Sequence, residues 1–128
     1  MTAHNEEYGI SNALGEYLSA VYELSESKPS VRITDVALYM NISKPSVNRA
    51  MNSLKKLGYI SHEPYGNVYL TDKGLALGKE LSEKKETIAR FFTVYFDLDH
   101  SSALHEAGKV IYCLSKGIID KMEKMSSN

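Results

Sequence analysis

The chain has 128 residues, a length that suits one compact domain or two small lobes sharing a core. Of these residues 43% are hydrophobic and 24% charged, which are the proportions of an ordinary soluble protein. No apolar run approaches the roughly 20 residues of a membrane helix, the N-terminus has no basic or apolar region of a secretory signal, and the single cysteine, Cys113, excludes an internal disulfide framework. We therefore expect a cytoplasmic protein without a membrane partner.

The formal net charge of −1 conceals an uneven distribution along the chain. Residues 1–29 carry five acids and one base, residues 30–74 carry three acids and six bases, and residues 75–128 carry eight of each. Because local charge governs the approach to a polyanion more than total charge does, the middle segment is the candidate for binding one.

The N-terminal part predicts two helices separated by a short strand. Apolar residues at helical spacing indicate a helix over 12–25, which ends at Lys28-Pro29-Ser30. The β-branched segment 31–33 indicates a brief strand. Thr34 has the features of an N-cap for a helix over 35–40.

A third helix is predicted over 43–57, after a turn at Asn41-Ile42. Ser43 is its N-cap, Pro45 lies in its first turn, where a missing N–H costs little, and Gly58 stops it. Its buried side is expected to consist of Val47, Ala50, Met51, Leu54 and Leu57.

Two β-rich segments, 59–62 and 68–70, flank a turn rich in Pro, Gly and Asn and predict a hairpin. Helix, strand, two helices and a hairpin is the element order of a winged helix-turn-helix, with 43–57 as its recognition helix. We expect a mainly α fold, with this DNA-binding domain over residues 1–73.

Residues 74–128 are expected to form a helical dimerisation domain. A long helix should run from Thr71-Asp72 to about Phe96, followed by helices capped by Ser101 and Ser115. These helices carry more apolar surface than so small a lobe can hide, which favours a homodimer over the alternative, a cap on the first lobe of the same chain. The expected interface comprises Leu77, Leu81, Ile88, Phe91, Ile111, Leu114, Ile118 and Met122.

The face of 43–57 opposite the buried side has several bases and no acid, whereas a solvated helix face usually mixes both. Arg49 can make a bidentate contact with guanine, and the asparagines match adenine. Hydroxyls and amides at the helix start can hold a phosphate, and the lysines add charge without reading sequence. We therefore expect this face to bind double-stranded DNA; the alternatives are a solvated surface or a winged-helix module that binds protein. The predicted DNA-binding residues are Thr34, Ser43, Lys44, Pro45, Ser46, Asn48, Arg49, Asn52, Lys55, Tyr65 and Asn67.

Four stretches resemble a family of bacterial metal-dependent repressors, that of the diphtheria toxin repressor and the manganese transport regulator. They are EYLSAVYEL (16–24), ITDVALYMNISKPSVNRAMNSLKKLGYI (33–60), LTDKGLALGKEL (70–81) and LHEAGKVIYCLS (104–115). They cover nearly the whole chain in the family's order and resemble the short form, without a C-terminal barrel-like domain. The resemblance implies a homodimeric transcriptional repressor on palindromic operators, with a divalent metal such as Mn, Fe or Zn bound between its lobes.

The metal-binding residues that the resemblance implies are mostly replaced. Glu16 occupies a ligand position, and His105 matches an ancillary histidine if one nearby residue is deleted. The other family positions hold Ser19, Lys85, Ala89, Gly108, Ile111 and Tyr112. Since Mn or Fe needs about five or six oxygen and nitrogen ligands, we expect weak metal binding or none. A displaced site using Glu16, His105, Glu106 and His100 is the alternative.

Lys85 introduces a positive charge where the family binds a cation. One hypothesis is that Lys85 pairs with Glu16 and replaces the metal; the alternative is a solvated lysine. A regulator of the same fold that responds to a non-metal effector, or acts constitutively, is therefore a rival to the metal sensor.

Enzymatic activity is not expected. The four histidines have no HExxH or comparable spacing, and there is no Gly-rich phosphate loop or nucleophile elbow. Cys113 lies beside an apolar stripe, which is typical of a buried small residue.

Overall fold

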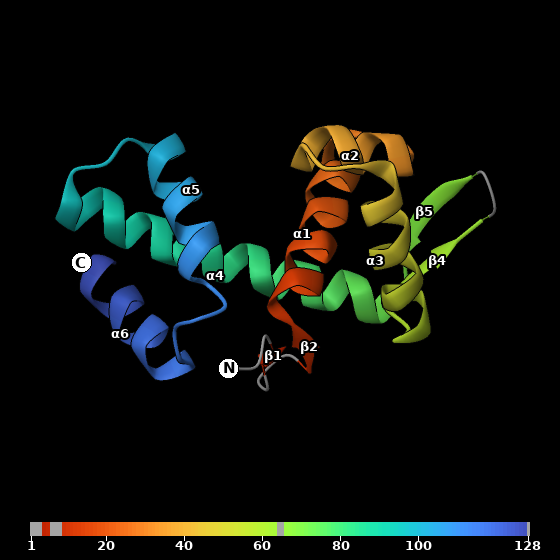
Figure 1. Cartoon of the computed structure of the whole chain (residues 1–128). Coiled ribbons are helices and arrows are strands. Elements are labelled where there is room, and N and C mark those ends of the chain that lie inside the picture. Colours follow the sequence, from red (N-terminus) through yellow and green to blue (C-terminus); the bar gives the residue numbers. More distant parts are fainter. Residues whose placement is uncertain (1–3, 6–8, 64–65, 128) are drawn as a thin grey trace. The chain divides into compact units, whose positions relative to one another are not determined.

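The computed structural model describes residues 4–5, 9–63 and 66–127. The chain forms two compact units, Met1–Lys79 (unit 1) and Glu80–Asn128 (unit 2). The fold is mainly α, a winged helix-turn-helix followed by a helical unit, as the sequence predicted. The elements, labelled in Figure 1, are β1 (His4–Asn5), β2 (Ile10–Ser11), α1 (Asn12–Ser27), β3 (Val31–Arg32), α2 (Ile33–Met40), α3 (Lys44–Lys56), β4 (Ile60–His62), β5 (Asn67–Leu70), α4 (Asp72–Phe96), α5 (His100–Val110) and α6 (Lys116–Ser126).

The boundary between the compact units lies within α4, whereas the predicted domains divide at residue 73, where the hairpin gives way to the long helix. The hairpin β1–β2 was not predicted. The predicted division by function stays a prediction.

The core of unit 1 lies between α1, α2, α3 and a three-stranded antiparallel sheet of order β3-β5-β4. Ser11 caps α1, its Oγ accepting the Leu14 N–H at 3.2 Å. Fully buried apolar side chains fill the space between the helices: Leu18, Val21, Val36, Val47, Met51 and Leu54. Truncating Leu18, Met51 or Leu54 to alanine should cost about 2–5 kcal/mol, so this core holds α3 against α1 and α2.

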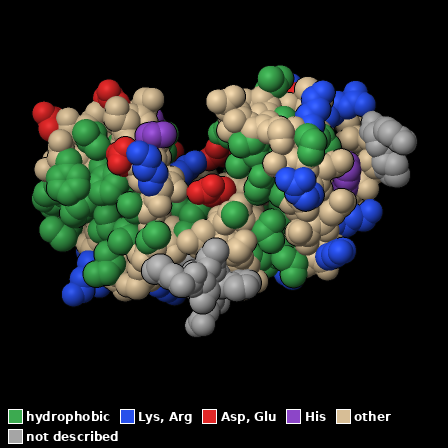
Figure 2. Space-filling model, viewed as in Figure 1, with side chains coloured by type: hydrophobic (Ala, Val, Ile, Leu, Met, Phe, Trp, Pro, Cys, Tyr) green, Lys and Arg blue, Asp and Glu red, His purple; other side chains and the backbone are tan. Residues whose placement is uncertain are grey.

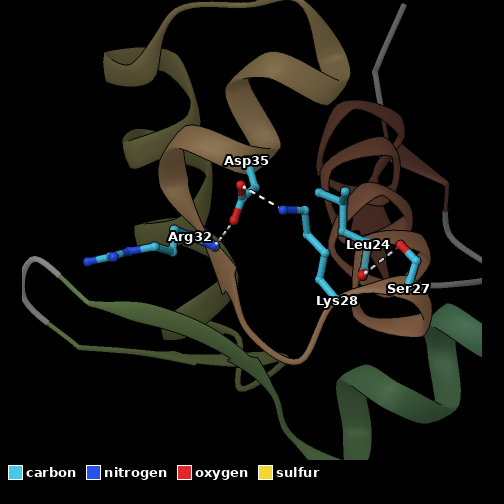
Figure 3. Close-up of polar contacts among 5 residues, drawn as sticks. All are labelled: Leu24, Ser27, Lys28, Arg32 and Asp35. Atoms are coloured by element: carbon cyan, nitrogen blue, oxygen red, sulfur yellow. Dashed lines mark hydrogen bonds and ion pairs between the residues drawn. The ribbon is translucent and has the colours of Figure 1, made fainter.

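The start of α2 differs from the prediction. Its N-cap is Arg32 rather than Thr34, which lies exposed in the first turn. The Asp35 carboxylate accepts the Arg32 backbone N–H at 2.9 Å, and the Lys28 ammonium lies 3.3 Å from its other oxygen (Figure 3). The hydrogen bond from Arg32, followed by the Lys28 contact, lowers the pKa of Asp35. An acid at this position satisfies an N–H of the helix start and so replaces the expected threonine cap.

A tyrosine joins α2 to α1. The Tyr39 hydroxyl donates to the Glu23 carboxylate. Partial burial, together with that carboxylate, raises the pKa of Tyr39 to about 12.

Helix α3, the candidate recognition helix, begins as predicted. Ser43 is its N-cap and Pro45 lies in its first turn. At its end, Gly58 has φ of 85°, and the N–H groups of Gly58 and Tyr59 donate to the carbonyls of Lys55 and Leu54, both at 3.0 Å. This is a Schellman-type ending, which requires the left-handed backbone that glycine adopts without strain. Leu57, predicted to be buried, is 42% exposed because it lies beyond the last helical residue.

Unit 2 contains most of α4 together with α5 and α6. Asp99, not Ser101, caps α5, accepting the Ser102 N–H at 2.7 Å, and this hydrogen bond lowers the pKa of Asp99. Ser115 caps α6 as predicted. Cys113, expected to be buried, is exposed in the turn after α5. Within residues 4–5, 9–63 and 66–127, none of the helices has the length and apolar character needed to span a bilayer.

Candidate nucleic-acid interface

The predicted DNA-binding face of α3 lies on the surface. Val47, Ala50, Met51 and Leu54 are buried, and the opposite face exposes Lys44, Asn48, Arg49, Asn52 and Lys55. Lys and Arg side chains gather over α3 and around the hairpin in Figure 2. This face of α3 thus presents three basic side chains and two amide side chains to solvent, without an acid among them.

A chain of hydroxyl groups orients the arginine of this face. The Ser43 hydroxyl donates to Ser46 Oγ at 2.9 Å, and Arg49 Nη2 donates to the same oxygen at 3.3 Å. Ser43, Ser46 and Arg49 lie three residues apart, the spacing that stacks side chains on one side of a helix. Ser46, predicted as a phosphate ligand, therefore also holds Arg49.

The start of α3 offers fewer free amides for a phosphate than the sequence suggested. Ser43 Oγ accepts the Ser46 N–H at 3.3 Å, and Pro45 has no N–H. Because the one hydroxyl proton of Ser43 goes to Ser46 Oγ, the exposed Lys44 ammonium is the charged donor for an anion at this end.

The wing supplies a second group of polar side chains. Asn67 Nδ2 donates to the Tyr69 hydroxyl at 3.1 Å, and Lys55 Nζ lies 3.4 Å from the His62 carbonyl. Tyr65, predicted to contact DNA from the wing tip, lies outside the described residues.

Arg32 is a candidate that the sequence prediction missed. Strand β3 pairs with β5 so that Arg32 lies opposite Asn67, and its exposed side chain points away from Asp35 in Figure 3. Thr34, the predicted contact nearby, is exposed in the same connection between β3 and α2. The sequence did contain a signal for this candidate, because Arg32 is the first base of the basic segment and lies in a predicted strand.

The positions that the resemblance implies for metal ligands hold few donor side chains. In unit 1, Glu16 is exposed, and desolvation raises the pKa of its carboxyl. In unit 2, the Lys85 Cδ lies 3.9 Å from the point where a side chain at Gly108 would begin, so the lysine stem lies over the glycine. His105 is exposed on α5. No group of three or more His, Cys, Asp or Glu side chains with metal-binding geometry occurs within the described part of the chain.

The predicted dimer residues of α4, α5 and α6 divide into two sets. Leu81, Ile88, Ile111 and Met122 are buried within the chain, whereas Ile118 is 47% exposed. Leu77, Phe91 and Leu114 are half-buried. Of the predicted dimer residues, those with surface available to a partner are therefore Leu77, Phe91, Leu114 and Ile118.

Comparisons with known proteins agree with this geometry. Residues 10–68 match the N-terminal DNA-binding domain of iron-dependent repressors. An uncharacterised HTH-type transcriptional regulator of Methanocaldococcus jannaschii is 30% identical over 89% of this chain and 92% of its own length. The chain belongs to the family of metal-dependent repressors. It is a DNA-binding transcriptional regulator of that family.

Two further matches have lower sequence identity. The regulator MntR of Listeria welshimeri is 28% identical over 86% of this chain and 77% of its own length. The structure of the metal-dependent transcriptional regulator MtsR superposes with a TM-score of 0.77 at 27% identity, covering 88% of this chain and 52% of that one. The chain thus spans about half the length of that solved repressor-family structure.

Proposed function

We propose that this member of the metal-dependent repressor family is a sequence-specific regulator that inserts α3 into the major groove of an operator, and that it is not an enzyme. The observation that carries the proposal is the acid-free exposed face of α3, with Arg49 held by Ser46 at 3.3 Å. A fixed guanidinium is suited to a bidentate contact with guanine, and Asn48 and Asn52 are suited to adenine. Lys44 and Lys55 neutralise phosphates and fix the register of the helix on the duplex.

The wing is assigned a supporting contact. Arg32 on β3 and Asn67 on β5 are cross-strand neighbours, and β5 is the strand that leaves the hairpin tip. A base and an amide in this position suit a phosphate or the minor groove next to the major-groove site of α3. Arg32 therefore joins the predicted DNA-binding residues.

A homodimer is the proposed assembly, with a palindromic operator as its consequence. Unit 2 exposes large apolar side chains at the end of α4 and on α6: Val94, Tyr95, Phe96, Ile118 and Met125. The Phe91, Phe92 and Phe96 rings lie within 5.4–6.3 Å of one another, and the Tyr95 hydroxyl donates to the Met125 carbonyl at 2.7 Å. Figure 2 shows hydrophobic side chains gathered over this part of unit 2. A second copy of the chain is the occupant that two-fold symmetric operator binding requires.

Regulation without a transition metal is the proposed departure from the family. Glu16 and His105 are too few donors for Mn or Fe, and Lys85 lies over Gly108 with a charge that opposes a dication. Operator binding should then be constitutive or respond to another effector. The proposed location is the cytoplasm, where the chromosome is accessible.

Genomic footprinting of the tagged protein, with and without added manganese, iron and zinc, tests the proposal. Discrete palindromic footprints whose occupancy is the same under all conditions are expected. The absence of any protected sequence would refute DNA-binding regulation, and footprints that appear only with metal would refute metal independence alone. The matched control is Arg49→Ala, which should remove the footprints while leaving the protein folded.

A further inference from the structure

The chain beyond α3 is held by the segment that starts α4. Three consecutive carbonyls, those of Leu57, Gly58 and Tyr59, follow the last helical residue of α3. The Lys73 ammonium donates to the first at 2.9 Å, the Thr71 hydroxyl to the second at 2.6 Å and the Thr71 backbone N–H to the third at 3.1 Å. All three contacts lie within unit 1 and join residues at least twelve positions apart.

Thr71 acts on both helices at once. Its Oγ1 accepts the Gly74 N–H at 3.1 Å, and its carbonyl accepts the Leu75 N–H at 2.8 Å, so Thr71 caps α4. The same hydroxyl has one proton, and that proton goes to the Gly58 carbonyl. The end of α3 and the beginning of α4 are therefore fixed by one side chain.

Lys73 contributes its charge to this junction. Its Nζ lies 4.4 Å from the centre of the Tyr59 ring, as well as on the Leu57 carbonyl. A cation there faces an aromatic ring and the negative end of the α3 dipole, both of which attract it. Although Lys73 belongs to the basic segment, its ammonium is engaged with the protein.

The backbones approach too closely for any residue but glycine at position 74. A Cβ there would lie 1.9 Å from the Tyr59 carbonyl oxygen. The segment Thr71–Gly74 is thus a close-fitting contact, and Thr71 and Lys73 make its polar bonds. We refer to these two residues as the clasp.

We propose that the clasp residues Thr71 and Lys73 are positioning residues for sequence reading by α3. This inference rests on the proposed function. Bidentate contacts with base edges require the helix within fractions of an ångström, whereas a lysine on a phosphate tolerates displacement. Loosening the end of α3 and the start of the wing should therefore weaken specific binding selectively.

The experiment uses two DNA probes, a duplex selected from a random pool by the unmodified protein and a scrambled duplex of the same length and composition. Fluorescence anisotropy gives both affinities at several salt concentrations. Thr71→Val and Lys73→Ala should each bind the selected duplex about tenfold more weakly, since each removes one or two hydrogen bonds of the junction. Affinity for the scrambled duplex and the salt slope should not change.

Conservative variants and a matched lysine serve as controls. Thr71→Ser keeps the hydroxyl and Lys73→Arg keeps a cationic donor, so both should restore specific affinity. Lys79→Ala removes an exposed lysine from the same helix and should bind both duplexes like the parent. Partial unfolding would lower both affinities in proportion, so the ratio of specific to scrambled affinity distinguishes a positioning role from a loss of stability. If Thr71→Val does not fold, the comparison of Lys73→Ala with Lys73→Arg tests the inference.

Two results would overturn the inference. Equal weakening on both duplexes, with a salt slope lower by about 1, would make Lys73 a phosphate contact. Specific binding by Thr71→Val and Lys73→Ala equal to that of Lys79→Ala would show that the junction does not position α3. If the unmodified protein selects no duplex, the proposed function fails first and the clasp with it.

Discussion

Arg49 Nη2 donates a hydrogen bond to Ser46 Oγ at 3.3 Å, one helical turn closer to the start of α3. The bond fixes a long exposed side chain before any DNA is present. Ordering such a side chain on binding costs about 0.5–1.5 kcal/mol of conformational entropy. Because the bond to Ser46 already orders Arg49 in the free protein, the entropy lost on binding DNA is smaller. The pair therefore makes predictions that an arginine acting alone would not.

The first prediction is a double-mutant cycle on Ser46 and Arg49. Arg49→Ala should cost about 1–3 kcal/mol of operator affinity, the value of a bidentate base contact. Ser46→Ala should cost less, about 0.5–1.5 kcal/mol, because it removes only the orientation of Arg49. In the Arg49→Ala background Ser46→Ala should cost almost nothing more, as measured by anisotropy. Additive losses would mean that Ser46 contacts DNA independently.

The second prediction separates charge contacts from base reading. Lys55→Ala and Arg32→Ala should each weaken binding to all sequences alike and reduce the salt slope by about 1. Lys121→Ala, a loss of the same charge from the exposed side of α6, is the control and should leave the slope unchanged. A slope that Arg32→Ala does not alter would remove Arg32 from the interface.

How much the sequence predicted depends on the range of the interactions. The recognition helix was placed almost to the residue, because Ser43, Pro45 and Gly58 act locally through caps and backbone preference. The start of α2 was misassigned, because residue 33 was assigned to the strand, whereas β3 ends at Arg32 and α2 begins at Ile33. The extent of β3 depends on its pairing with β5, more than thirty residues away, which local capping rules do not include.

The candidate site shows the same limit. The composition of the α3 face was evident from helical periodicity, but the Ser46–Arg49 bond depends on rotamers that periodicity does not determine. Arg32 was missed because its relation to Asn67 arises only from the β3–β5 register, across more than thirty residues. The engagement of Lys73 with Leu57 and Tyr59 was invisible for the same reason.

The third prediction concerns pH. Hydrogen bonding to Arg32, followed by Lys28, lowers the pKa of Asp35 below its ordinary 3.8 in the folded chain. A lowered folded pKa means that the stabilisation is complete above the ordinary value and is lost as pH falls through the folded one. Asp35→Asn should therefore reduce the free energy of unfolding by about 0.5–1 kcal/mol at pH 7, and the difference should shrink below pH 4. Urea unfolding of both proteins at several pH values measures it; a difference that is constant down to pH 3 would contradict this cause.

The fourth prediction concerns assembly. Sedimentation at micromolar concentration should show a dimer. Phe96→Asp and Ile118→Lys should shift it towards monomer, because a charge placed in an apolar interface is desolvated without a partner. Leu38→Asp is the control: Leu38 is 77% exposed on α2 of unit 1, outside the predicted interface. A monomer for the unmodified chain would remove both the homodimer and the palindromic operator.

The last prediction concerns metal. With Ser19, Lys85 and Gly108 among the positions for which the family resemblance implies metal ligands, the chain should bind Mn²⁺ weakly or not at all, and operator affinity should be insensitive to chelator. Two causes act together. Few oxygen and nitrogen donors are available to replace the water shell of the ion, and the Lys85 ammonium opposes a second positive charge.

Calorimetric titration of chelator-treated protein with Mn²⁺, Fe²⁺ and Zn²⁺ measures the outcome, with Glu16→Ala as the matched variant. A stoichiometric micromolar site that Glu16→Ala abolishes would restore the metal sensor. Heat that is the same in both proteins would assign any uptake to scattered surface histidines and carboxylates.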